Sequence, residues 1–228
     1  MGIFSGVKKV FGRGRVLYYP GCMTQSDKDL LTNYKSILSD IGINFIIAPK
    51  MPCCGFPAYT AGYRKEFSEI LAKNKKLLKG LGISKIISNC PHCVWAFKNL
   101  YKMEVEHTNQ TLAGNSRKLQ AVHSGEINLH DSCFLARKMG SWREPRIILR
   151  SLGFRIDEMK RSKTKTFCCG SVCNDLSRNN PVLGKKIAHE RLKEATKRLV
   201  TTCPYCYKHL KQNSKDVKVF EISELLIE

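Results

Sequence analysis

The chain has 228 residues, 43% of them hydrophobic, which is enough for one large domain or for two lobes with packed cores of their own. Its 11 cysteines fit an extracellular disulfide framework or an intracellular metal protein, and because no secretory signal pattern is visible we expect metal sites in a reducing cytoplasm. No apolar run approaches the roughly 18 residues of a membrane span. The net charge of +20 suits anionic partners, but the basic residues are scattered without interleaved aromatic residues, which argues against nucleic-acid binding.

The first predicted element is a basic amphipathic N-terminal arm, residues 1–14. Its apolar residues share one face at helical spacing, with lysine and arginine beside them. A short helix of this kind can lie on an anionic membrane, dock on a partner or cover the core of its own domain, and the sequence leaves these alternatives open. We therefore expect a cytoplasmic protein, with a peripheral membrane contact through residues 1–12 as one option.

From residue 15 onward, short β-rich runs alternate with stretches of helical period. The predicted strands cover 16–19, 44–48, 85–88, 127–130, 154–158, 199–202 and 217–220. The clearest predicted helices cover 27–40, 63–80, 142–152 and 181–198. This alternation predicts an α/β fold of two duplicated Rossmann-like βα repeats, with parallel sheets and helices on both faces. In such sheets ligands bind beyond the carboxyl ends of the strands, where the cysteines fall.

The cysteines divide the chain into two similar halves. Each half carries a single cysteine, then Cys-Cys-Gly, then Cys-Pro-x-Cys, and the matching positions are 111, 115 and 113 residues apart. The first cysteine set is Cys22, Cys53, Cys54, Cys90 and Cys93. The second cysteine set is Cys133, Cys168, Cys169, Cys203 and Cys206. We infer the duplication of one metal-binding unit, with repeats at 15–118 and 119–228 and only Cys173 outside the pattern.

Five thiols with an adjacent pair suit a multinuclear metal centre better than a single ion. A mononuclear zinc site takes four ligands, whereas neighbouring thiolates can reach different irons of one iron–sulfur cluster. Gly55 and Gly170 are expected to let the backbone pass close to the cluster without a side chain in the way. The principal prediction is two iron–sulfur clusters. The alternatives are zinc in one repeat with a cluster in the other, and purely structural thiols or disulfides.

The pattern Cys–x30–Cys-Cys-Gly–x34–Cys-x2-Cys, present twice with small length variation, resembles the cysteine-rich CCG domain. The segment 129–153, which contains His-Asp-x-Cys and a following Pro-Arg helix, and the closing "TTCPYCYKHL" are also similar to this family. The domain occurs in the B and D subunits of heterodisulfide reductases, in iron–sulfur subunits of glycolate, lactate and glycerol-3-phosphate oxidising enzymes, and in some archaeal succinate dehydrogenases. The resemblance covers 15–228 and implies that each cysteine set forms one site.

The resemblance also implies a chemistry. In the heterodisulfide reductases such sets hold non-cubane [4Fe–4S] clusters that cleave a disulfide, and in the succinate dehydrogenase relatives one set holds zinc. We therefore expect an iron–sulfur redox subunit, inactive without ferredoxin-like or flavin-containing partner subunits, with the second cysteine set as ligands of the reactive cluster and zinc as an option in the first. The alternatives are an electron relay that feeds quinone in a glycolate, lactate or succinate-type dehydrogenase, and a zinc-stabilised interaction module.

Several residues near the cysteines admit more than one interpretation. Cys173 follows the second Cys-Cys-Gly, where the family commonly has small residues, and is either a passive buried thiol or an additional ligand or redox thiol. His130 and Asp131 either tune or protonate a cluster or serve local capping and packing. His92 is expected to be exposed near the first cysteine set, and because the second repeat has Tyr205 in its place, a shared ligand role is not expected.

Overall fold

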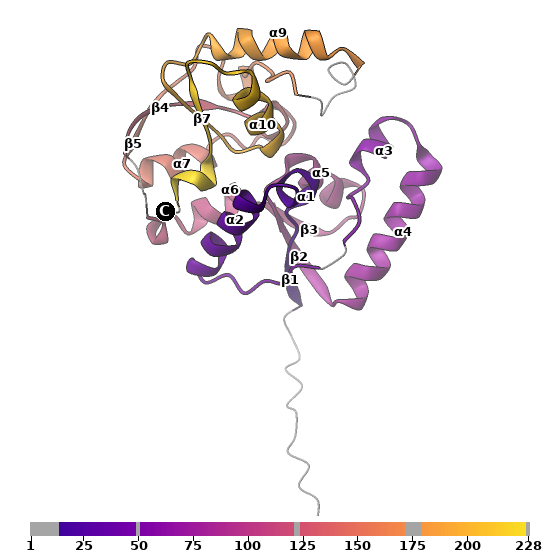
Figure 1. The fold of residues 1–228 in the computed structure, drawn as a ribbon. Coiled ribbons are helices and arrows are strands. Elements are labelled where there is room, and N and C mark those ends of the chain that lie inside the picture. The colour runs from indigo at the N-terminus through magenta and orange to yellow at the C-terminus, as the bar shows by residue number, and fades with distance from the viewer. Residues whose placement is uncertain (1–13, 49–50, 121–123, 172–178, 227–228) are drawn as a thin grey trace, which may run out of the picture.

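The computed structural model describes residues 14–48, 51–120, 124–171 and 179–226. Two parallel sheets, one from each half of the chain, form the framework of the molecule (Figure 1). The predicted α/β class and its duplicated parallel sheets are confirmed. The N-terminal arm and Cys173 lie outside the described residues.

The first sheet has the order β1-β2-β3, all parallel. Its strands are β1 (Arg15–Tyr18), β2 (Ile83–Ser88) and β3 (Glu104–His107). The predicted strand at 44–48 is reduced to a single parallel bridge between Ile46 and Leu17, on the outer side of β1. The C-terminal residues of β1 and β2 are buried, as expected of parallel strands that helices cover on both faces.

The second sheet has the order β5-β4-β6-β7, again all parallel. Its strands are β4 (Gly125–His130), β5 (Phe154–Asp157), β6 (Arg198–Thr201) and β7 (Lys218–Glu221). β4, β6 and β7 match β1, β2 and β3 in order, and β5 takes the edge that the bridge at Ile46 marks in the first sheet. The two sheets therefore share one topology.

Helices follow the strands in both halves. The first half has α1 (Gly21–Gln25), α2 (Lys28–Asp40), α3 (Phe56–Thr60), α4 (Arg64–Gly80), α5 (Pro91–Asn99), α6 (Thr108–Gly114) and the short η1 (Ser116–Lys118). The second half has η2 (Phe134–Lys138), α7 (Glu144–Ser151), η3 (Lys163–Lys165), α9 (Pro181–Leu192), α10 (Pro204–Asn213) and η4 (Ile222–Leu225). In the part of the chain that the structure describes, no helix has both the length and the apolar character needed to cross a bilayer.

The predicted helix at 181–198 is too long. As expected, Asn180 caps its start, because the side-chain oxygen accepts the N–H of Leu183 at 3.0 Å. The helix ends at Leu192, because the chain must turn before β6 begins at Arg198. The Asn128 side chain holds that turn by accepting from the N–H and the hydroxyl of Thr196 at 2.7 and 2.9 Å.

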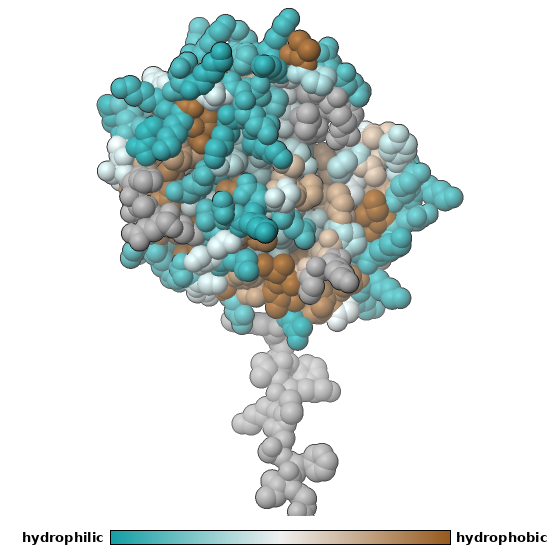
Figure 2. All heavy atoms as spheres, in the orientation of Figure 1, coloured by the Kyte–Doolittle hydropathy of each residue, from teal (hydrophilic) through white to brown (hydrophobic). Residues whose placement is uncertain are grey.

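The two halves pack against each other in a reciprocal way. α2 of the first half contacts η4 of the second, and α7 of the second contacts α6 of the first. One hydrophobic cluster contains residues of both halves, including Tyr34 and Ile37 beside Ile148 and Leu225. Hydrophilic side chains cover most of the face in Figure 2. The shared core fixes the two sheets relative to each other and therefore also fixes the sites at their ends.

Candidate metal centre

The first cysteine set gathers in the loops and helix starts beyond the first sheet. Cys22 lies in α1 directly after β1, and Cys90 and Cys93 lie at the start of α5 directly after β2. Pro91 opens α5, where a missing N–H costs no helix hydrogen bond. All five thiols line one cleft, together with Tyr19, Phe56, Pro57, His92 and Tyr205.

The second cysteine set occupies the matching places. Cys133 precedes η2 after β4, and Cys203 and Cys206 lie at the start of α10, which also opens with a proline. The cysteine pair lies between η3 and α9. Three thiols of this set are buried, those of Cys169, Cys203 and Cys206. The first set also has three buried thiols, those of Cys54, Cys90 and Cys93.

Hydrogen bonds between thiols link the members of each set. In the second set they join all five cysteines in the order Cys133, Cys168, Cys169, Cys206, Cys203. In the first set they join Cys53, Cys54, Cys93 and Cys90. Cys22 is exposed instead, and its Sγ lies 3.4 Å from the hydroxyl oxygen of Tyr205.

These contacts favour negative charge on particular sulfurs. The pKa of Cys90 falls to about 5, chiefly because the Cys93 thiol donates to it. The pKa of Cys169 also falls to about 5, because the thiol of Cys168 and then that of Cys206 donate to it. The Cys54 thiol likewise has a lowered pKa through the Cys53 thiol. Each set thus holds crowded sulfurs with thiolate character, which is the donor set that iron–sulfur clusters and zinc require.

The two glycines after the cysteine pairs take part in helix packing, and their expected proximity to a cluster stays a prediction. Gly55 and Gly170 both have φ of +80°, the left-handed region that favours glycine. A Cβ at Gly55 would lie 2.9 Å from the ring of Phe67 in α4, and a Cβ at Gly170 would overlap the carbonyl oxygen of Gly184 in α9. The missing side chain therefore makes room for a helix. Toward the thiols the backbone contributes a donor, since the N–H of Gly170 lies 3.3 Å from the Sγ of Cys168.

The variable residue of each Cys-Pro-x-Cys loop reaches toward the opposite repeat. Tyr205, from the second repeat, contacts Cys22 of the first. His92, from the first repeat, lowers the pKa of Cys203 through its charge, after the larger effect of the Cys206 thiol. The two rings lie 5.6 Å apart between their centroids. The prediction that His92 is exposed is wrong: it is buried against Phe56 and Phe134.

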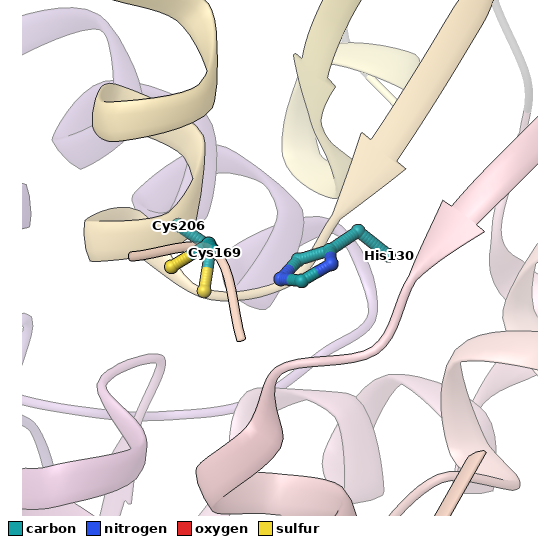
Figure 3. A group of neighbouring side chains, drawn as sticks. All are labelled: His130, Cys169 and Cys206. Atoms are coloured by element: carbon teal, nitrogen blue, oxygen red, sulfur yellow. The ribbon is translucent and has the colours of Figure 1, made fainter. Parts of the chain in front are cut away.

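His130 and Asp131 have separate surroundings. Arg146 donates to both carboxylate oxygens of Asp131 at 2.8 Å, and the N–H of Lys163 donates to one of them at 2.6 Å. Asp131 therefore anchors a loop, as the local interpretation predicts. The His130 ring instead faces the sulfurs of Cys169 and Cys206 (Figure 3). Burial lowers the pKa of His130 to about 3, with a further contribution from the charge of Arg191.

Sequence reasoning missed three residues at the sites. Tyr19 lines the first cleft at the position that corresponds to His130, three residues before the single cysteine. Arg191 lies in α9 and contacts His130, which is 61 positions away in the chain. Arg137 donates to the thiol of Cys133. Only Tyr19 had a sequence signal, its alignment with His130 in the repeat.

The comparisons agree with the motif. The model of the CCG cysteine-rich domain matches residues 16–98 and 127–211, and the chain belongs to this family. It is 27% identical to the EtfAB:quinone oxidoreductase of Syntrophomonas wolfei (92% of this chain, 34% of the relative) and 28% identical to the B subunit of the fumarate reductase (CoM/CoB) of Methanothermobacter marburgensis (93% and 46%). It is also 27% identical to the D subunit of the dihydromethanophenazine:CoB–CoM heterodisulfide reductase of Methanosarcina barkeri (96% and 60%). The chain thus spans between a third and three fifths of the length of these relatives.

A solved aspartate racemase of Picrophilus torridus matches this chain with a TM-score of 0.40 and 12% identity, over 93% of this chain and 91% of the racemase. This likeness is too weak to support an argument.

Proposed function

We propose that this chain is an iron–sulfur redox subunit of a multi-subunit, heterodisulfide reductase-like oxidoreductase, with one [4Fe–4S] cluster, of non-cubane type, in each cysteine set. The observation that carries the proposal is the assembly of two five-cysteine sets at equivalent ends of two parallel sheets. The heterodisulfide reductase and fumarate reductase subunits among the relatives support the redox assignment. When bound, the clusters would supply one-electron chemistry.

The chain's own residues prepare each site for an anionic sulfur-rich group. Cys90 and Cys203 are the N-cap residues of α5 and α10, so that the positive ends of these helix dipoles face the thiolates. Tyr19, Phe56 and Pro57 line the first cleft and limit the access of water to it. Both sites thus place thiolates at the N-termini of helices, and side-chain rings line the first of them.

The proximity of the two sets supports electron transfer between them. Tyr205 lies next to Cys206 in the chain and contacts Cys22 of the other set. Its ring packs edge-on against the ring of His92. In the sequence, His92 stands between Cys90 and Cys93 of the first set. These two rings contact each other between the two repeats, and we propose that electrons pass between the sets across them.

The second cysteine set is the proposed reactive centre, with Cys133, Cys168, Cys169, Cys203 and Cys206 as ligands. Arg137 donates to the half-buried Cys133 and would draw an anionic disulfide toward this thiol. Reduction of the S–S bond takes two electrons and two protons and releases two thiols. A ferredoxin-like or flavin-containing partner subunit would supply the electrons.

Two alternatives keep support from specific observations. An electron relay that feeds quinone is suggested by the EtfAB:quinone oxidoreductase among the relatives. Membrane contact through residues 1–12 would then be expected, as binding to anionic liposomes that their deletion abolishes. Zinc in the first site is suggested by Cys22, which shares the cleft but is not among the four thiols that hydrogen bonds link.

Metal and sulfide analysis of the anaerobically purified chain tests the proposal. Two clusters give about eight irons and a similar amount of sulfide per chain. Four irons with one zinc per chain would assign zinc to one set and a cluster to the other. If the zinc lies in the first set, the Cys54→Ser variant loses the zinc and keeps the iron. A colourless chain with two zincs, even after anaerobic reconstitution with iron and sulfide, would overturn the redox assignment.

A further inference from the structure

We propose that His130 is a hydrogen-bond donor to the thiolates of Cys169 and Cys206, that Arg191 holds it in this role, and that it is not a metal ligand. The inference rests on the proposed function only in that a metal centre occupies the second cysteine set. It assigns a positioning and tuning role to a pair of buried side chains, and it distinguishes the second site from the first.

Distance alone suggests the opposite role. His130 ends β4 and is fully buried, and a nitrogen of its ring and the sulfurs of Cys169 and Cys206 all lie within 4.8 Å of one another. Figure 3 shows the ring with one nitrogen toward the two sulfurs and the other turned away. One imidazole and two thiolates at this spacing are compatible with a metal site. The chemistry of the second nitrogen decides between ligand and donor.

The hydrogen bond from Arg191 fixes the tautomer of His130. The Nε of Arg191 donates to Nδ1 of His130 at 2.8 Å. A guanidinium group has only donors, so Nδ1 must present its lone pair and the ring proton must lie on Nε2. Within the described part of the chain, Nε2 is buried and has no hydrogen-bond partner, and the sulfurs of Cys169 and Cys206 lie within 4.8 Å of the ring. A nitrogen that carries a proton cannot bind a metal, but it can donate to the neighbouring thiolates.

Arg191 is itself held in place, and this makes the tautomer a fixed feature. Its Nη1 donates to the carbonyl oxygen of Arg161 at 2.8 Å and to the carboxylate of Glu194 at 3.0 Å. Its side chain has no solvent exposure. The guanidinium therefore cannot turn its Nε away from His130 without breaking these two partly buried hydrogen bonds.

The first repeat lacks this arrangement at the equivalent places. Tyr19 corresponds to His130, and its hydroxyl donates to the carbonyl oxygen of Pro52 at 3.0 Å. A Cβ at Gly55 would contact Ile70 in α4, and a Cβ at Gly170 would contact Ile187 in α9, so these two isoleucines are equivalent. Four residues after each of them in the chain are Asn74 and Arg191, which are therefore equivalent too. Asn74 donates to the carbonyl oxygen of Cys53 and to the hydroxyl of Tyr101. The polar side chains of the first repeat thus support the backbone and not the sulfurs.

A donor to sulfur has a measurable consequence. Hydrogen bonds to cluster sulfurs stabilise the more negative, reduced state and raise the reduction potential. We expect His130→Leu to lower the midpoint potential of one of the two sites and to leave the other unchanged. His130→Gln keeps an N–H near the same place and should stay close to wild type. His189→Leu makes the same change at an exposed histidine of α9 and should have no effect.

Pulsed EPR of the reduced full chain with ¹⁵N-labelled histidine tests the inference directly, with His130→Leu to assign the signal. A hydrogen-bonded His130 gives a weak nitrogen coupling that disappears in His130→Leu, whereas a ligand nitrogen gives a strong one. A strong coupling, or an unchanged midpoint potential in an iron-replete His130→Leu, would overturn the inference and leave the proposed function intact.

Failure of the proposed function would look different. If the full chain takes up zinc and no iron, nitrogen NMR of the zinc-loaded protein still reports the tautomer of His130. His107 provides the internal reference, because its Nδ1 accepts the N–H of Asn109 at 3.1 Å and its proton must also lie on Nε2. A proton on Nδ1 of His130 would contradict the inference.

Discussion

The two cysteine sets have the same residues in the same order but different surroundings. In the first set, hydrogen bonds link four thiols, and the exposed fifth, Cys22, contacts Tyr205 of the other repeat. In the second set they link all five, and Arg137, Arg191 and His130 bring positive charge and N–H donors to them. Duplication has therefore preserved the ligands while the neighbouring side chains diverged. The difference indicates that two similar donor sets serve unequal roles.

The largest expected effect comes from removing a central thiol of either set. Cys54 and Cys169 each accept hydrogen bonds from two neighbouring thiols of their set. We expect Cys54→Ser and Cys169→Ser each to abolish the metal centre of its own set and to leave the other, so that iron per chain falls by about half. Cys22→Ser should cost less metal than the matching Cys133→Ser, and equal losses would contradict the inequality of the two sets.

Substitution of the two glycines should also separate the repeats. Both have a left-handed backbone, but a Cβ at Gly170 would meet the backbone of α9, whereas a Cβ at Gly55 would meet the side-chain ring of Phe67. We expect Gly170→Ala to lower the free energy of unfolding by about 3 kcal/mol or more and Gly55→Ala by about 1–2 kcal/mol. Urea denaturation of the two variants measures the difference. A larger loss of unfolding free energy in Gly55→Ala than in Gly170→Ala would contradict the expected cost of the contact with the α9 backbone.

Stability should depend on pH through the buried Glu221. This residue caps η4, as His107 caps α6 in the first repeat, and it accepts the hydroxyl of Tyr34 at 2.7 Å. Burial raises its pKa to about 7, so that the folded state favours the protonated carboxyl. Its contribution is therefore complete below the pKa of about 4.5 in the unfolded chain and is lost as the pH rises through 7.

The size of this loss is up to about 3 kcal/mol between pH 4.5 and 8. Glu221→Gln removes the titrating group and should flatten the pH profile of the unfolding midpoint in this range. A profile that keeps the wild-type slope would assign the dependence to other groups.

The smallest effect is expected at the contact between the repeats. Once Cys22 is a thiolate ligand, the Tyr205 hydroxyl must be the donor in their 3.4 Å contact. Tyr205→Phe should therefore lower the potential of the first site, by less than His130→Leu lowers that of the second, because the contact is long and exposed. Redox titrations of both variants measure the two shifts in midpoint potential. A larger shift in Tyr205→Phe than in His130→Leu would contradict the expected order.

The sequence was sufficient for the parts of the molecule that repeat locally. The spacing of the cysteines and the alternation of β-rich and helical runs predicted the parallel sheets and the places of the thiols after β1, β2, β4 and β6. The edge position around Ile46 was harder, because its apolar run resembles a strand although only one bridge forms. The boundary between repeats at 118 and 119 remains a prediction.

Contacts between distant segments were beyond the reach of the sequence. His92 looks like an exposed loop residue, and only the packing of one repeat against the other buries it. Likewise, nothing in a local pattern pairs His130 with Arg191, since α9 reaches β4 only in the folded chain. The pattern therefore identified candidate ligands, whereas the groups that make the two sets unequal depend on tertiary structure.

A reductive titration of the anaerobically purified chain, followed by EPR, tests whether the two cysteine sets hold two unequal iron–sulfur clusters. We expect two reducible iron–sulfur signals with different midpoint potentials, one missing in Cys54→Ser and the other in Cys169→Ser. No reducible signal in the iron-loaded chain, or a single signal that survives both substitutions, would contradict this expectation.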